Sequence, residues 1–153
     1  MVAQESGGAT RSITVDYEFP EPPEAVWRAL TEPGLLARWL MPGDIRPVVG
    51  HRFTLQAQPA GGWDGVIRCE VLAADEPRLL RYTWRGGAQE VDGYGHLLDT
   101  VVTWTLRSRE GGGTHLRLEH AGFRSEDEFA WRALGSGWRT KQASLAEAVT
   151  AAG

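Results

Sequence analysis

The chain opens its ordered part with alternating apolar and polar positions, as in a half-buried β-strand. Ile13, Val15, Tyr17 and Phe19 are separated by single polar residues. Pro20 and two further prolines then interrupt the alternation, because proline donates no hydrogen bond to a neighbouring strand. This pattern predicts a first strand over residues 13–19.

Two short helices are predicted next. Apolar residues recur at helical spacing over residues 25–30 and again over residues 35–40, and Glu32-Pro33-Gly34 separates the two runs. Pro42-Gly43 ends the second run.

The middle of the chain returns to alternation with period two and predicts a series of strands. The segments are residues 44–49, 53–57, 67–71, 80–84, 101–106 and 115–120. Short turns rich in glycine, proline or acidic residues join most of them, which favours an antiparallel sheet. The exception is the glycine-rich connection over residues 85–98.

The last element is predicted as one continuous helix from Ser125 to about Thr150. Ser125 and Glu128 match the S-x-x-E capping box, in which each side chain accepts a hydrogen bond from a free backbone N–H. One apolar stripe follows at near-helical spacing: Trp131, Leu134, Trp138, Leu145 and Val149. Gly135 and Gly137 within it predict close passage over the sheet, or room for a pocket.

Composition places the chain among ordinary globular domains. Its 153 residues fit one domain, with 42% hydrophobic and 24% charged residues. The net charge of −4 and the scattered basic residues argue against binding to nucleic acid or an anionic membrane. Cys69 is the single cysteine, so no intrachain disulfide is possible. With no signal peptide or transmembrane pattern, we expect a cytoplasmic protein.

Several segments, in this order, resemble a known family. They are residues 22–31 (PPEAVWRALT), 36–40 (LARWL), 75–84 (DEPRLLRYTW), 101–106 (VVTWTL) and 113–123 (GTHLRLEHAGF). The chain resembles the START-like (SRPBCC) superfamily and, within it, the AHSA-type homologues of the activator of heat-shock-protein ATPase. The resemblance implies an α+β helix-grip fold, in which a curved antiparallel sheet of about six or seven strands wraps around the C-terminal helix. A single domain over residues 12–150 would then follow a flexible tail over residues 1–11.

Aromatic residues supply the candidate ligand site. Three lie on inward strand phases, two on the helix stripe, and Trp39 and Trp63 where loops can form a mouth. The full candidate set is Trp39, Trp63, Cys69, Tyr82, Trp84, Trp104, His120, Trp131 and Trp138. One reading is an aromatic-walled cavity for a hydrophobic ligand, and the other is that the rings fill the core.

His120 is the leading polar candidate, because it is in phase with inward leucines. It could anchor a ligand or act as an acid or base. The alternative, which we favour, is a core histidine bonded to a carbonyl or another side chain. His115 and His120 point to opposite faces of their strand, so no metal site is predicted. Cys69 reads as a buried, inert thiol.

The resulting functional hypothesis is binding of a small hydrophobic or aromatic ligand between sheet and C-terminal helix, without catalytic residues, metal or cofactor. A co-chaperone-like interaction domain stimulating a heat-shock ATPase is the first alternative. An enzyme of the polyketide cyclase or aromatase kind is the second, although the inward phases are nearly all apolar. The expected partners are a small ligand or, in the first alternative, a chaperone, with no nucleic acid and no membrane insertion, and the protein would be a monomer or homodimer.

Overall fold

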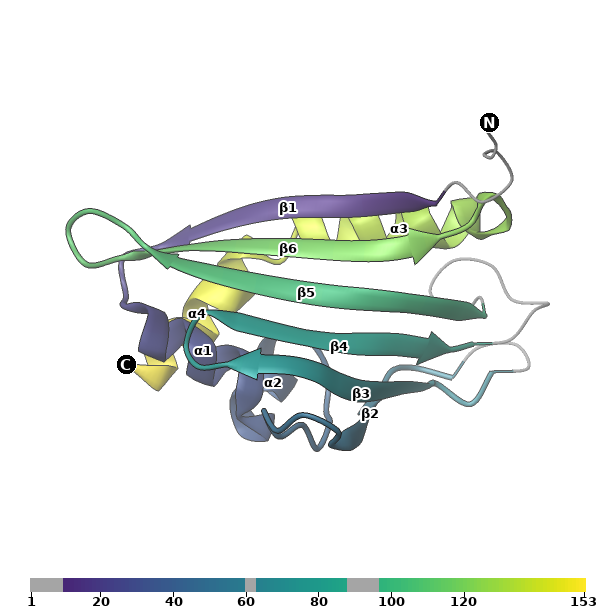
Figure 1. The fold of residues 1–153 in the computed structure, drawn as a ribbon, viewed down its shortest axis with the longest axis horizontal. Helices are drawn as coiled ribbons and strands as arrows, with labels where there is room; N and C mark the ends of the chain where they lie inside the picture. Colours follow the sequence, from purple (N-terminus) through teal and green to yellow (C-terminus); the bar gives the residue numbers. More distant parts are fainter. Residues whose placement is uncertain (1–9, 60–62, 88–96) are drawn as a thin grey trace.

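A six-stranded antiparallel sheet carries helices on one of its faces in the computed structural model, which describes residues 10–59, 63–87 and 97–153 (Figure 1). The strands are β1 (Arg11–Phe19), β2 (Arg52–Gln56), β3 (Val66–Asp75), β4 (Leu79–Gly86), β5 (Leu98–Ser108) and β6 (Thr114–Phe123). Their order across the sheet is β1-β6-β5-β4-β3-β2. The predicted α+β helix-grip class is confirmed.

The register of the strands places the large apolar side chains on the face that the helices cover. Leu80 on β4 lies opposite Trp104 on β5, and Trp104 lies opposite Leu118 on β6. Their side chains are fully buried, whereas Arg81 and Arg117 on the outer face are exposed. The alternation read from the sequence therefore assigned these strand faces correctly.

The two short helices predicted after the first strand are confirmed as α1 (Pro23–Thr31) and α2 (Pro33–Trp39). Glu32 ends α1 and caps α2, because Pro33 occupies the first turn of a new helix. The Trp39 indole Nε1 donates to the carbonyl of Ala29 over 2.8 Å and so ties the two helices together. No helix in the described part of the chain is long and apolar enough to cross a membrane.

The prediction of one continuous C-terminal helix is wrong. A short 3-10 turn (Ser125–Asp127) leads into α3 (Glu128–Arg139), and α4 (Gln142–Ala152) follows after a break at Thr140 and Lys141. The Thr140 hydroxyl and backbone N–H both donate to the carbonyl of Gly137, which tightens and ends the last turn of α3. The two halves have different neighbours, since α3 packs on β1 and α4 packs chiefly on α1 and α2.

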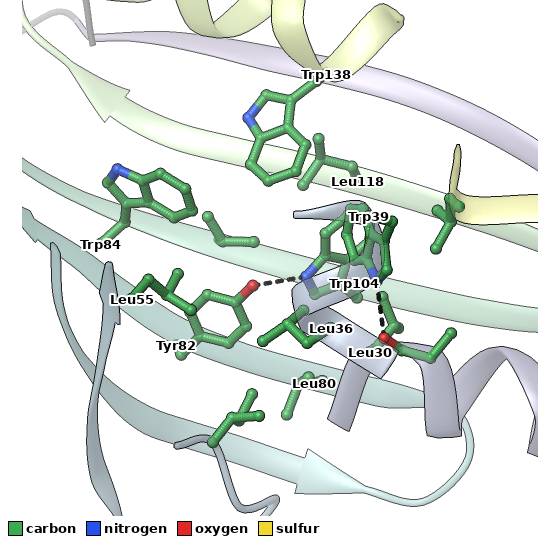
Figure 2. Packing of buried hydrophobic residues seen from close by; sticks show 14 of the residues in the cluster. Leu30, Leu36, Trp39, Leu55, Leu80, Tyr82, Trp84, Trp104, Leu118 and Trp138 are labelled. Atoms are coloured by element: carbon green, nitrogen blue, oxygen red, sulfur yellow. Dashed lines mark hydrogen bonds between the residues drawn. The ribbon is translucent and has the colours of Figure 1, made fainter. Parts of the chain in front are cut away.

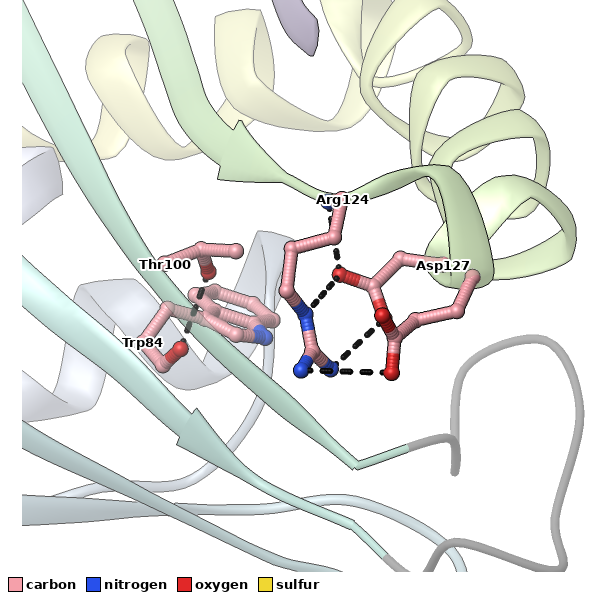
Figure 3. Close-up of polar contacts among 5 residues, drawn as sticks. Trp84, Thr100, Arg124 and Asp127 are labelled. Carbon is pink, nitrogen blue, oxygen red and sulfur yellow. Dashed lines mark hydrogen bonds and ion pairs between the residues drawn. The ribbon is translucent and has the colours of Figure 1, made fainter. Parts of the chain in front are cut away.

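The predicted capping box of Ser125 and Glu128 is also wrong. The carboxylate of Asp127 accepts from the Arg124 backbone N–H over 2.8 Å and also binds the Arg124 guanidinium (Figure 3). Glu128 instead pairs with Arg132 one helical turn later. The 3-10 turn brings the short Asp127 side chain back to the chain entry, so the cap forms one residue earlier than the motif indicated.

Residues 44–49 form no strand, contrary to prediction. Gly43 makes one isolated bridge to Leu55, and the Asp44 carboxylate then accepts from the Thr54 backbone N–H over 3.0 Å. Pro47 lacks the N–H that a continuing ladder would need. Ile45 is nevertheless buried, so the segment contributes to the core without pairing.

Two other expectations fall partly outside the described residues. Residues 1–9 of the predicted tail and residues 88–96 of the glycine-rich connection are not described, and β1 begins at Arg11.

Of the two helix glycines, Gly137 borders a pocket. A Cβ on Gly135 would meet the Arg139 guanidinium at 3.0 Å, so Gly135 does not mark an approach to the sheet.

Candidate functional site

An apolar pocket of about 120 Å³ lies where α3 passes over the β3–β4 part of the sheet. The segments after α2 and β2 close its other sides. Its lining consists of Leu40, Met41, Ala57, Trp63, Ile67, Trp84, Leu134, Gly137, Trp138 and Lys141. All of these residues except Lys141 have uncharged, largely apolar side chains.

Three indole rings dominate the walls of this pocket. Trp84 on β4 and Trp138 on α3 meet edge to face, with ring centroids 5.6 Å apart (Figure 2). The Trp63 indole N–H donates to the carbonyl of Val66 over 3.3 Å, which orients this ring at the start of β3. The Trp84 indole N–H, by contrast, has no acceptor among the described residues.

Behind the Trp84 and Trp138 walls, His120 belongs to a buried chain of hydrogen bonds. Because an indole N–H only donates, the 3.1 Å contact from Trp138 makes Nδ1 of His120 the acceptor. Nε2 then carries the proton and donates to Oγ1 of Thr100 over 2.8 Å. The Thr100 hydroxyl donates in turn to the carbonyl of Trp84 over 2.9 Å, as Figure 3 shows.

This arrangement holds His120 as a neutral imidazole. The side chain is 0% exposed, and burial lowers its pKa from 6.5 to about 3. Both ring nitrogens have partners, and His120 is absent from the pocket lining. The geometry matches the core-histidine alternative, in which the ring accepts from the Trp138 indole and contacts the Trp84 ring at 5.3 Å between centroids.

Three further predicted residues fill the core instead of lining the pocket. Trp104 donates from its indole N–H to the Tyr82 hydroxyl over 3.1 Å, and Trp39 meets Trp104 edge to face at 5.8 Å (Figure 2). Trp39 is only 3% exposed, so it lies inside the domain and not at a mouth. For these rings, the core-filling reading describes the observed packing.

Cys69 and Trp131 lie away from the apolar pocket. Cys69 is buried on β3, and this burial raises the pKa of its thiol. Trp131 lies near the N-terminal end of α3, and its indole N–H donates to the carbonyl of Ser12 over 3.1 Å. The Arg11 guanidinium lies 4.8 Å from the centre of the same ring.

Of the nine candidate residues, Trp63, Trp84 and Trp138 line the pocket, and the other six do not. Sequence reasoning missed the aliphatic lining and Lys141. A signal was present, because Lys141 follows Trp138 by one helical turn. Within the described residues, no group of three or more His, Cys, Asp or Glu side chains could hold a metal ion.

The sequence of this chain matches a known protein family. The family model described as Activator of Hsp90 ATPase homolog 1-like protein matches residues 20–150. The chain belongs to this family. No curated protein matches the sequence. The match agrees with the AHSA-type resemblance seen in the sequence.

Solved structures support the same membership. The crystal structure of protein MLL2253 from Mesorhizobium loti is 39% identical, with a TM-score of 0.78 over 92% of this chain and 98% of that one. CalU16 from Micromonospora echinospora is 31% identical, with a TM-score of 0.66 over 92% of this chain and 77% of its own. BH1534 from Bacillus halodurans is 27% identical, with a TM-score of 0.70 over 91% and 96%.

Proposed function

We propose that this AHSA1-like domain binds a small hydrophobic ligand in the pocket between α3 and the sheet. The observation that carries the proposal is a hollow walled by Trp63, Trp84 and Trp138 in a core that is otherwise filled by large rings. Apolar hollows of this kind exclude water and favour apolar occupants. The described lining holds no carboxyl or imidazole group, which supports binding over acid–base chemistry.

The size of the pocket indicates the size of the ligand. Its volume of about 120 Å³ is similar to that of an engineered cavity of about 150 Å³ that takes up benzene. It is smaller than the roughly 300 Å³ at which pockets for drug-sized molecules begin. We therefore expect one aromatic ring or a short branched acyl chain inside, with any remaining part of the ligand reaching solvent.

A neutral single-ring compound provides the direct test. 3-Phenyl-1-propanol should bind with measurable heat in isothermal titration calorimetry and should raise the melting temperature of the protein. Ala57→Phe introduces a ring at the pocket wall and should abolish both effects. Ala151→Phe is the matched control, because Ala151 lies exposed near the end of α4 and is not among the residues that line this pocket.

Native mass spectrometry of the purified protein complements the titration, since a retained small molecule would add a defined mass. That mass should be missing from Ala57→Phe and present in Ala151→Phe. If 3-phenyl-1-propanol bound to neither wild type nor the control, or bound equally to Ala57→Phe, the pocket would not be the ligand site.

The family description favours a second candidate, stimulation of a heat-shock-protein ATPase through the domain surface. This role would not need an open pocket. The measurement is ATP hydrolysis by a purified heat-shock ATPase with and without the protein. Equal stimulation by wild type and Ala57→Phe would support the surface role, and the absence of stimulation would remove it.

A further inference from the structure

We infer that the ligand of this pocket carries a negatively charged group, as in a hydrophobic carboxylic acid, and that the Lys141 ammonium pairs with this group at the pocket edge. The inference rests on the proposed function, because it names the ligand class for the same site. It follows from where the chain places its one lysine.

The break between α3 and α4 positions Lys141. Its backbone N–H donates to the carbonyl of Trp138 over 3.3 Å, which holds it beside the indole that forms the pocket wall. The next helix begins at Gln142. Lys141 therefore lies in the short segment between the two helices and lines the pocket.

Lys141 differs in type from the other cations of the chain, and it has no counter-ion in the described part of the chain. It is the single lysine among 16 Lys and Arg residues. Arginines such as Arg85 and Arg117 pair with Asp99 and Asp16 on the sheet surface. Lys141 is half-buried as a residue, and within the described residues its ammonium makes no ion pair and no hydrogen bond.

The nitrogen-bearing side chains of the lining are all donors. Besides the Lys141 ammonium, the Trp84 indole N–H lacks an acceptor in the described part of the chain, and no lining side chain carries a negative charge. An anionic head group would give the Lys141 ammonium its counter-ion, while the apolar wall excludes water from one side of the pair. Reduced access of water and salt weakens screening, so the attraction should exceed that of an open surface pair.

A matched series of three single-ring compounds tests the inference. 3-Phenylpropanoate, 3-phenyl-1-propanol and 3-phenylpropylamine share their ring and chain length but differ in charge. By calorimetry at low salt, we expect the acid to bind wild type about three- to tenfold more tightly than the alcohol. The amine should bind more weakly than both. The advantage of the acid should shrink at high salt.

Two variants locate the effect. Lys141→Gln should remove the preference for the acid while keeping the affinity for the alcohol. Arg139→Gln lowers the net charge equally but lies exposed at the end of α3, outside the pocket lining, and should retain the preference.

The single lysine also allows a direct observation. Reductive ¹³C-methylation labels only Lys141 and the chain's α-amino group, and the methylated amine keeps its charge. The Lys141 methyl signal should shift on titration with 3-phenylpropanoate and much less with the alcohol.

The outcomes separate this inference from the proposed function. Equal affinity of wild type for acid and alcohol would overturn the inference and leave the pocket proposal standing. An acid preference that survived in Lys141→Gln would overturn it as well. Binding of none of the three compounds would overturn the pocket proposal and the inference together.

Discussion

The indole N–H of Trp138 donates to Nδ1 of His120, and this 3.1 Å contact joins α3 to β6 inside the core. The same indole packs edge to face against Trp84 and Trp104. One side chain therefore holds the helix on the sheet and forms a wall of the pocket.

Trp138→Phe should destabilise the protein by about 3 kcal/mol. The substitution leaves the buried Nδ1 of His120 without a donor and opens space between Trp84 and Trp104. Urea unfolding at pH 7 measures the change. Trp131→Phe is the control and should cost about 1 kcal/mol or less, because Trp131 is only half-buried near the N-terminal end of α3. Equal losses would refute the central role assigned to Trp138.

His120 should make stability fall as the pH is lowered. Its folded-state pKa of about 3 lies below the unfolded value near 6.5, so between these pH values the unfolded chain binds a proton that the native protein does not. Above pH 6.5 both states are neutral and the contribution vanishes. Between pH 7 and pH 5 this difference amounts to about 2 kcal/mol of unfolding free energy.

His120→Gln tests this dependence, since the amide can accept from Trp138 and donate to Thr100 without titrating. Urea unfolding at pH 7 and pH 5 should show a smaller loss for this variant than for wild type. His51→Gln should behave as wild type does, because the His51 ring is not part of the buried chain of hydrogen bonds and contacts the Asp44 carbonyl at an exposed site. A wild-type loss identical to that of His120→Gln would contradict the assignment.

Tyr82→Phe should cost about 1–3 kcal/mol of stability. Trp104 is fully buried, and its indole N–H would lose its acceptor, the Tyr82 hydroxyl, and stay unpaired inside the core. Tyr17→Phe is a useful comparison and should cost less. Tyr17 donates to the carbonyl of Trp138, which keeps a second donor in the Lys141 N–H. The order of the two unfolding midpoints decides the prediction.

Asp127→Asn should cost about 1–2 kcal/mol. Asp127 is 1% exposed and its carboxylate accepts from both the backbone and the guanidinium of Arg124, so loss of its charge weakens several contacts at once. Glu126→Gln, at an exposed carboxylate 3.4 Å from the same guanidinium, should change stability by less than about 0.5 kcal/mol. Thermal unfolding of the two variants provides the comparison.

The sequence was a good guide to elements and faces. Alternation placed Tyr82 and Trp104 on the inner face, and the Glu32-Pro33-Gly34 interruption correctly separated α1 from α2. It was a poorer guide where a local pattern allowed two outcomes. The stripe from Trp131 to Val149 continued across Thr140, although hydrogen bonds of Thr140 end the helix there.

The amino-acid sequence by itself determined the strand faces, because periodicity records which side of an element is buried. The family and its helix-grip class came from the resemblance of several segments to known members. Only the tertiary structure decided which rings fill the core, which border a pocket, and that Lys141 is part of its lining. Periodicity does not say how deep in the core a side chain lies. The distance between β4 and α3, which leaves room for the pocket, depends on packing among residues far apart in the chain.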